Sequence, residues 1–496
     1  MKILKLILAT IVLTGLASCD ILDSQEPQQS LPTDEVVGDA SGIDNLVTGM
    51  YDGLQDPAIS GGNFNVLPEI MADNVSWSGS FANYARQASK SMLPGDGQIG
   101  DWWAISYREI NTANVLLDAI GEIDDPDFTE ADRSLTEGEA RFVRGMLYFE
   151  LARVFAKPWG FTGDNSHNAV PLRVDEGVQG VEDFQNLERD DLASVYAQAE
   201  EDLQEAADLL PDEGIRSDNR ATRYAALGYL KRLEMTRGNF EEAAQYADEI
   251  ISSGNFSLTD NPAGPFENEF STESIFEIIH TSQDNPGVND GQNAFYADTD
   301  RGGRGDIQYS ANYVEALNST VTEQQQSEIE AEGYTVTDTR ENLITIDNED
   351  VNATVKFPDG VNNADNVMNL RYAAVLLSRA EALVETATDI NDVPQEAYDR
   401  LNEVRTRSIV VTDEDGLPQN SVIEFEDGDF ADRQEMIDAI LLERRVELAF
   451  EGDRFYTLKR RGLEIDGLSP DDNSITFPIP QGEIDANPDM DQNDGY

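Results

Sequence analysis

The feature that most constrains the fold of this chain is the recurrence of apolar residues at helical spacing. The two clearest stripes run through Phe240–Ile251 and Leu370–Val384, where apolar side chains recur three or four residues apart. This spacing places the apolar side chains on one face of an α-helix. The same pattern predicts further helices at 102–120, 135–156, 186–210, 221–236, 395–408 and 432–451. The sequence therefore predicts a mainly α-helical protein.

Two of these helices are close enough in sequence to form a hairpin. They lie within residues 216–256 and are joined by Arg237-Gly238-Asn239. Small residues follow the aromatic Phe240 at the spacing of a tetratricopeptide repeat, although the full repeat signature is not reproduced. We therefore expect a scaffold of degenerate tetratricopeptide-like helical repeats.

Long segments without helical periodicity separate the predicted helices. They span about 57–100, 256–310 and 318–366 and are rich in Gly, Asn, Asp and Pro. Long aperiodic loops are usually functional or disordered. Because these loops contain aromatic side chains, we expect them to be ordered and to form a loop-rich, ligand-binding half. Together with the helices they would make one domain over residues 34–496.

The first eighteen residues have the pattern of a bacterial lipoprotein signal peptide. Two lysines precede an apolar run that is too short to span a bilayer. The run ends in Leu16-Ala17-Ser18-Cys19, which resembles a lipobox, and Cys19 is the only cysteine in the chain. We predict a signal peptide at 1–18, lipidation of Cys19 and a flexible leader at 19–33. The alternative is a plain secretory signal followed by an unmodified thiol.

Charge and composition exclude several classes of function. The chain has 97 Asp and Glu against 34 Lys and Arg, a formal charge of −63, so it would repel the phosphates of a nucleic acid. One cysteine and two histidines are too few for an intrachain disulfide or a Cys/His zinc site. A carboxylate-rich surface also suits strong brine, where salt screens self-repulsion, and we expect a salt-loving host.

No motif in the sequence predicts a catalytic site. The segment Gly95–Gly100 matches the GxGxxG pattern of dinucleotide-binding folds, but polar residues precede it and Asp96 would oppose a phosphate, so we interpret it as a turn. The chain contains no Gly-Lys dipeptide for a P-loop and no GxSxG elbow.

Three carboxylates in the C-terminal part are a better candidate for chemistry. Glu443, Glu447 and Glu451 lie one helical turn apart, where bare carboxylates would repel one another. The arginines nearest to them in sequence are Arg444, Arg445, Arg454, Arg460 and Arg461. We therefore expect an ion-pair network here and not a catalytic carboxylate pair.

A structural calcium ion is left as an open alternative. Asp298-Thr299-Asp300 and Asp489-Met490-Asp491-Gln492-Asn493 offer the oxygen ligands that Ca²⁺ prefers, but neither completes an EF-hand loop. No other cofactor is predicted.

Aromatic side chains outside the helical stripes are the main candidates for a binding site. They lie in two of the loop-rich segments and comprise Trp77, Phe81, Tyr84, Phe295, Tyr296 and Tyr309. Flat rings beside Asn and Asp suit a sugar, because its C–H face stacks on a ring while its hydroxyls form hydrogen bonds. The alternative is that these rings pack on the core.

Short motifs spread over nearly the whole chain point to one protein family. They are Cys19–Asp23, Pro68–Asp73, Trp103–Asn114, Glu139–Phe149, Ala169–Leu172, Glu273–Glu277, Leu370–Ala373, Glu443–Arg454, Phe477–Gln481 and Asn493–Tyr496. In this order the motifs resemble the SusD/RagB family of outer-membrane nutrient-uptake lipoproteins. Each motif alone is weak evidence for the family, and the resemblance depends on finding all of them in the family's order.

The resemblance implies both a fold and a function. The fold would be a helical scaffold of four tetratricopeptide-like units with an irregular ligand-binding half. The protein would sit on the outer face of the outer membrane, capture oligosaccharides (peptides in some members) and pass them, without catalysis, to a SusC-like TonB-dependent transporter. The family's ligand groove lies in the loop-rich half, so we assign ligand binding to Trp77, Tyr84, Tyr296 and Tyr309, with Asp73, Asn74 and Arg304 as polar partners.

Two other functions stay open at the level of sequence. A helical-repeat scaffold lipoprotein would bind only proteins or peptides and would leave the loop aromatics unexplained. A secreted glycosidase would use two of the many carboxylates and would lose turnover on a single Glu→Gln substitution.

Overall fold

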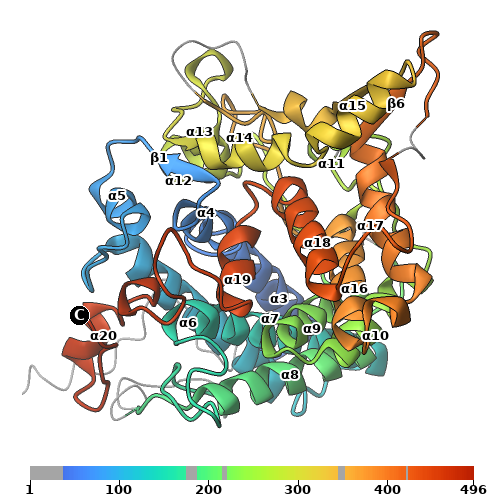
Figure 1. Cartoon of the computed structure of the whole chain (residues 1–496). Coiled ribbons are helices and arrows are strands. Elements are labelled where there is room, and N and C mark those ends of the chain that lie inside the picture. Colours follow the sequence, from blue (N-terminus) through green and yellow to red (C-terminus); the bar gives the residue numbers. More distant parts are fainter. Residues whose placement is uncertain (1–36, 175–186, 215–219, 268, 345–351, 420–422) are drawn as a thin grey trace, which may run out of the picture.

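The computed structural model describes residues 37–174, 187–214, 220–267, 269–344, 352–419 and 423–496. Long helices pack side by side, and shorter helices and strands cover one end of them (Figure 1). The signal peptide, Cys19 and the leader at 19–33 lie outside the described residues.

The long helices form a stack in which chain neighbours are mostly also neighbours in space. In the first part, α6 (Gly97–Ala119) packs on α7 (Glu130–Phe155), α7 on α8 (Leu192–Leu209), α8 on α9 (Arg223–Arg237) and α9 on α10 (Phe240–Ser252). In the second part, α10 packs on α16 (Tyr372–Thr386), which contacts α17 (Gln395–Ser408) and α18 (Arg433–Glu447). α3 (Ala40–Leu54) lies against α6. This arrangement confirms the predicted mainly helical, repeat-like fold.

The α9–α10 hairpin shows how the sequence directs this stacking. Gly238 adopts a left-handed conformation (φ 79°) that ends α9 and allows the chain to reverse. On α10, the small side chains of Ala243 and Ala244 pack with Met235 of α9 and Ala382 of α16. Small residues at this contact let three helices approach closely.

The predicted helix at 432–451 ends earlier than expected. α18 stops at Glu447, and the chain turns through two left-handed residues, Phe450 (φ 72°) and Gly452 (φ 78°), before α19 (Asp453–Arg460) begins. The backbone N–H groups of Phe450 and Gly452 donate to the buried carboxylate of Glu69 at 3.0 and 2.9 Å. A Cβ on residue 452 would lie 2.8 Å from the Cα of Asn65, so the turn requires glycine there.

The loop-rich segments contain more regular structure than the sequence indicates. Their short helices are α4 (Asn63–Ile70), α5 (Ala82–Ala88), α11 (Gly264–Glu267), α12 (Gly287–Asp290), α13 (Gln292–Tyr296), α14 (Ala311–Asn318) and α15 (Glu323–Ala331), and α20 (Gln481–Ala486) lies near the C-terminus. The strands form antiparallel pairs: β1 (Val75–Trp77) with β3 (Ile307–Tyr309), β2 (Ser274–Ile278) with β5 (Val367–Arg371), and β4 (Thr335–Asp338) with β6 (Ile409–Thr412). Strands of three to five residues are too short to show alternation in a sequence.

The ion-pair network around Glu443, Glu447 and Glu451 is confirmed. All three carboxylates are at most 9% exposed. Their partners come from other parts of the chain and are Arg340, Lys356, Arg371, Arg405 and Arg407. Arg371 bridges two of the glutamates, with 2.8 Å to Glu447 and 2.7 Å to Glu451.

The arginines nearest in sequence pair elsewhere, which corrects that part of the prediction. Adjacent residues of a helix point in different directions, so arginines that neighbour these glutamates in sequence reach other elements. Arg444 pairs with Asp453, Arg445 and Arg454 with Asp73, and Arg460 and Arg461 with Glu381.

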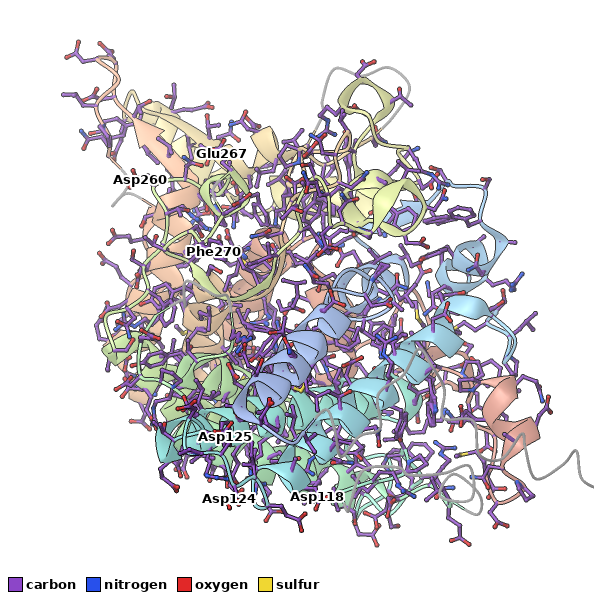
Figure 2. All side chains as sticks on the ribbon, turned by 180° about the vertical axis from the view of Figure 1, so that it is seen from behind. Asp118, Asp124, Asp125, Asp260, Glu267 and Phe270 are labelled. Carbon is purple, nitrogen blue, oxygen red and sulfur yellow. The ribbon has the colours of Figure 1, made fainter. Side chains whose placement is uncertain are left out.

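Carboxylates are spread over the outside of the molecule. Figure 2 labels Asp118 and Asp124, at and just beyond the end of α6, and Asp260 and Glu267 at the opposite end; all four are exposed. No helix in the described ranges combines the length and apolarity needed to cross a membrane.

Candidate ligand-binding site

Four aromatic rings from two segments, residues 77–84 and α13, form one cluster around β1. Trp77 stacks on Tyr84 of α5 with ring centroids 5.0 Å apart and an interplanar angle of 15°. Phe295 of α13 meets the edge of Trp77 at 5.7 Å and lies 5.1 Å from Tyr84. Tyr84 and Phe295 are buried, whereas Trp77 and the neighbouring Phe81 are half-buried. The partly exposed rings of Trp77 and Phe81 therefore pack on the buried rings of Tyr84 and Phe295. We call these four rings the aromatic surface.

A cation borders the aromatic surface. The guanidinium of Arg304 lies 4.3 Å from the ring centroid of Phe81 and pairs with Asp306 at 2.7 Å. Burial raises the pKa of Asp306 above its ordinary value, although Arg304 opposes this shift. The pair fixes the guanidinium beside the rings, where it can donate hydrogen bonds.

The β1–β3 pairing positions these groups. Trp77 lies opposite Ile307 and Val75 lies opposite Tyr309, so Trp77 and Tyr309 share one face of the two-stranded sheet. Tyr309 is half-buried. Beyond β1, a Cβ on Gly79 would lie 2.5 Å from the Asp306 carboxyl carbon and 2.6 Å from the Trp77 ring, so only glycine lets this turn approach both.

Two carboxylates near Tyr84, and a third beside them, are not predicted by the sequence. Asp56 follows α3, Asp101 lies in α6 and Asp290 ends α12. Burial and repulsion from Asp56 and Asp290 raise the pKa of Asp101, and burial and Asp56 raise that of Asp290. These residues are at least 45 positions apart from one another in sequence, so no local pattern connects them. Together with the rings and Arg304 they offer acceptors, donors and apolar faces to a polyhydroxylated ligand.

Three of the assigned ligand residues are buried. Tyr84 stacks on Trp77 within the aromatic surface, whereas Tyr296 and Asn74 lie elsewhere, and we correct the assignment of these two. Tyr296 is 1% exposed and packs on Phe357 and Phe450, with centroids 5.1 and 6.0 Å away. Asn74 is fully buried, where its Nδ2 donates to Glu69 at 3.2 Å and its Oδ1 accepts from Arg445 at 2.8 Å. Neither side chain reaches the aromatic surface.

Asp73 also has a structural environment. Its carboxylate is 2.8 Å from Arg454 and 3.0 Å from Arg445. Although burial raises the pKa of Asp73, the two guanidiniums outweigh burial and hold it below its ordinary value. Asp73 thus joins the start of β1 to α18 and α19, and we do not include it in the site. Of the seven assigned residues, the structure brings Trp77, Tyr84 and Arg304 together and places Tyr309 on the same sheet face.

The other motifs considered from the sequence have local structural roles. The glycine-rich segment at 95–100 follows helix α5, not a strand, and its buried Asp96 accepts from Arg86 at 3.0 Å. Asp298 accepts from the backbone N–H of Arg301 at 3.0 Å, and Asn493 donates to the Phe477 carbonyl at 2.7 Å. Within the described part of the chain, no group of three or more His, Cys, Asp or Glu side chains is placed to hold a metal ion.

Comparison with known proteins relates this chain to one group. Residues 20–235 match a family model described as "Starch-binding associating with outer membrane", and residues 346–473 match the model of the SusD family. The chain is 25% identical over 543 aligned residues to SusD-like protein P2 of Formosa agariphila, with all of both chains covered. SusD-like protein P25 of the same organism is 23% identical, with 98% of each chain covered.

Solved structures share the same fold. A SusD superfamily protein from Bacteroides thetaiotaomicron superposes with a TM-score of 0.75 at 23% identity, covering 93% of this chain and 100% of the other. A SusD-like carbohydrate binding protein from Bacteroides vulgatus has a TM-score of 0.68 at 21% identity, covering 86% of this chain and 84% of the other. The similarity therefore extends over the helical scaffold and the loop-rich segments alike.

Proposed function

This chain belongs to the SusD/RagB family, and from that premise we propose that it binds oligosaccharides at the cell surface and delivers them to a TonB-dependent outer-membrane transporter. In this proposal Cys19 carries the lipid anchor, the protein faces the cell exterior, and it performs no catalysis. The host is salt-loving, in keeping with the charge of −63.

The observation that carries the proposal is the aromatic surface with its polar border. Stacked rings offer a broad apolar face to the C–H groups of a sugar ring. Arg304 and the carboxylates near Tyr84 supply donors and acceptors for hydroxyl groups. The name of the Bacteroides vulgatus neighbour, a carbohydrate binding protein, agrees with this chemistry.

Ligand binding can be tested with a matched pair of tryptophan variants. Trp77 and Trp159 are both half-buried and both stack on a tyrosine, at 5.0 Å on Tyr84 and 5.3 Å on Tyr196. Trp159 lies in the turn after α7, packs on α8 and is not part of the aromatic surface. We expect isothermal titration with a panel of neutral oligosaccharides to find a ligand, Trp77→Ala to weaken its binding at least tenfold, and Trp159→Ala to leave it unchanged.

Several results would contradict this assignment. Equal losses of ligand affinity in the two variants would mean that Trp77→Ala weakens binding only by destabilising the fold, and not by removing a ligand contact. Binding of peptides in place of all glycans would favour the peptide-binding alternative. Hydrolysis of a bound glycan would favour the glycosidase, which the buried and ion-paired state of Glu443, Glu447 and Glu451 argues against.

Delivery to a transporter requires a partner in the same membrane. We propose to purify the C-terminally tagged protein from its own membranes in mild detergent and to identify co-purifying proteins by mass spectrometry. A stoichiometric partner of β-barrel transporter size is the expected result. Purification of the protein alone, or with inner-membrane partners only, would overturn the transport role while leaving glycan binding intact.

A further inference from the structure

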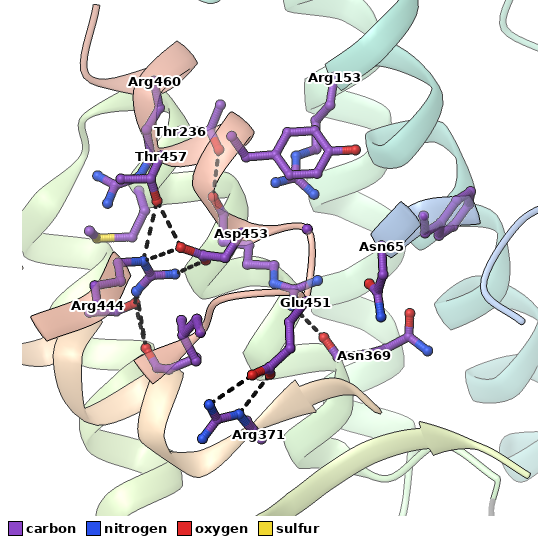
Figure 3. A pocket seen from close by; sticks show the side chains of 18 of the residues that line it. Asn65, Arg153, Thr236, Asn369, Arg371, Arg444, Glu451, Asp453, Thr457 and Arg460 are labelled. Carbon is purple, nitrogen blue, oxygen red and sulfur yellow. Dashed lines mark hydrogen bonds and ion pairs between the residues drawn. The ribbon is translucent and has the colours of Figure 1, made fainter. Parts of the chain in front are cut away.

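A narrow cavity with an unusual lining lies where α9, α16, α18 and α19 meet (Figure 3). Its volume is about 60 Å³, enough for one or two small molecules or ions. The charged side chains on its wall are Arg153, Lys231, Arg232, Arg371, Arg444 and Arg460, with Glu150, Glu451 and Asp453. None of these residues belongs to the aromatic surface.

The acidic groups of the wall are already neutralised by arginines. Figure 3 shows Arg444 beside Asp453 and Arg371 beside Glu451. The Nε of Arg444 lies 2.9 Å from Asp453, and the Nε of Arg371 lies 2.7 Å from Glu451. Glu150 accepts from Arg153 at 2.8 Å. These carboxylates are therefore engaged on the walls of the cavity.

Lys231 on α9 is the residue that this arrangement leaves without a counterion. Its side chain is buried with 1% exposure, and its Nζ donates to the Ser378 hydroxyl at 3.3 Å. Among the described residues, no carboxylate pairs with this Nζ within 4.0 Å, and Asp453 attracts it only from farther away. An ammonium has three N–H donors, and a buried charge without a partner is strongly unfavourable.

Ser378 cannot compensate for this charge. Its hydroxyl donates to the Ala374 carbonyl at 2.7 Å and also lies 3.1 Å from the Nη1 of Arg444. The Ser378 oxygen therefore accepts from two cations, Lys231 and Arg444, and carries no negative charge to neutralise either. Burial, together with Arg444 and Arg232, lowers the pKa of Lys231 well below its ordinary value, as expected for a cation among cations.

A second donor faces the same cavity. The hydroxyl of Tyr456 on α19 is buried and has no hydrogen-bond partner in the part of the chain that the structure describes. Its ring is held by Arg153, whose guanidinium carbon lies 3.2 Å from the ring centroid. This hydroxyl is therefore free to donate a hydrogen bond to an acceptor inside the cavity.

We propose that this cavity, whose wall includes the ammonium of Lys231 and the hydroxyl of Tyr456, binds a small monovalent anion, chloride, at Lys231. The volume and the three carboxylates on the wall disfavour sulfate, phosphate and organic acids, which are larger or more highly charged. Arg232 and Asp453, with side chains 26% and 19% exposed, form the route to solvent. The ion joins α9 to α19 and neutralises the interior cation in a protein whose surface is strongly acidic.

The test compares halides with an anion too large for the cavity. Full-length protein in detergent is unfolded by heat in sodium chloride, bromide or gluconate at equal ionic strength. We expect the halides to raise the unfolding temperature above that in gluconate by about 1–2 °C at roughly ten times their Kd. Lys231→Met should abolish this halide-specific difference. Lys90→Met, at a lysine outside the cavity whose ammonium pairs with Asp466, should retain it.

Diffraction provides a measurement that does not depend on a variant. Crystals of the wild-type protein soaked in bromide should show an anomalous peak within about 3.5 Å of the Lys231 Nζ. Equal unfolding temperatures in halide and gluconate, no bromide peak, or a halide-specific difference that survives in Lys231→Met would each overturn the proposal and assign the cavity to water.

Discussion

Glu447 contacts arginines from three segments that are far apart in the sequence, Arg340, Arg371 and Arg407. Burial alone would raise the pKa of Glu447. The guanidiniums of Arg407, Arg371 and Arg340 outweigh burial and hold that pKa well below its ordinary value of 4.5. A buried carboxylate with several partners is a site where removing one charge leaves others uncompensated.

We expect Glu447→Gln to lower the free energy of unfolding by about 3–5 kcal/mol at neutral pH. Because the pKa of Glu447 is lower in the folded than in the unfolded chain, this contribution is present above about pH 4.5 and is lost as the pH falls further. Denaturant unfolding of the wild type and of Glu447→Gln between pH 7 and pH 3 should show that the difference in their free energies of unfolding becomes smaller as the pH falls.

Glu249→Gln is the matched control for this prediction. Glu249 also pairs with an arginine, Arg223 at 2.5 Å, but its side chain is 47% exposed. Exposed ion pairs contribute little to stability, so Glu249→Gln should lower the free energy of unfolding by less than about 1 kcal/mol. Equal losses in the two variants would show that the Glu447 network is no stronger than a surface pair.

Individual binding residues were harder to predict than their neighbourhood. Phe295 and Tyr296 are adjacent, yet Phe295 joins the aromatic surface and Tyr296 packs on Phe357. The sequence identifies the aromatic segment, but α13 has only five residues, too few for a stripe that would reveal its inner face. Asn74 has a polar side chain that is typical of a loop, and its burial is explained by its partners Glu69 and Arg445, the second of which lies 371 positions away.

At the scale of secondary structure, the contact between α7 and α8 depends on a glycine. A Cβ on Gly145 of α7 would lie 2.9 Å from the Ala199 carbonyl oxygen and 3.0 Å from the Asp202 Cβ of α8. Gly145→Ala should therefore force the helices apart and destabilise the protein by about 1–3 kcal/mol, measured by chemical denaturation.

Gly49→Ala tests whether this effect comes from packing. Gly49 lies in α3, is exposed, and has no neighbouring atom within 4 Å of an added Cβ. Here alanine should stabilise the protein by about 0.5–1 kcal/mol through helix propensity. A stabilising Gly145→Ala substitution would contradict the close packing of α7 and α8.

Helices were more predictable than strands for a physical reason. The helix predicted at 395–408 has the bounds of α17, because its apolar stripe is long and a proline precedes it. The strands are three to five residues long, and the partner of β1 lies some 230 positions away. β2 and β5 are buried along their whole length, so they show no alternation of apolar and polar residues.

At the scale of the whole molecule, the proposed anchor determines where the protein works. Cys19→Ala removes the thiol that the lipid would modify. We expect the variant to lose incorporation of labelled palmitate, to retain its signal peptide by intact mass, and to disappear from the outer-membrane fraction. Ser18→Ala keeps a small residue before the cysteine and should behave as wild type. Palmitate labelling of the Cys19→Ala protein would refute lipidation at this site.

Charge acts on the molecule as a whole because acidic groups greatly outnumber basic ones. With a formal charge of −63, the folded chain repels itself, while its strongest ion pairs are buried and little affected by salt. Raising sodium gluconate from 0.1 to 1 M shortens the screening length from about 10 to about 3 Å. We expect the unfolding temperature to rise with this change.

Gluconate is chosen so that the proposed chloride site adds nothing to the salt effect. Sucrose at matched osmolality is the control, because it does not screen charge, and the rise in gluconate should exceed the rise in sucrose. If the unfolding temperature instead falls with gluconate, attraction between surface charges would dominate over repulsion. The acidity would then not be an adaptation to a salt-loving host, and the surface carboxylates would have to be explained by local pairing.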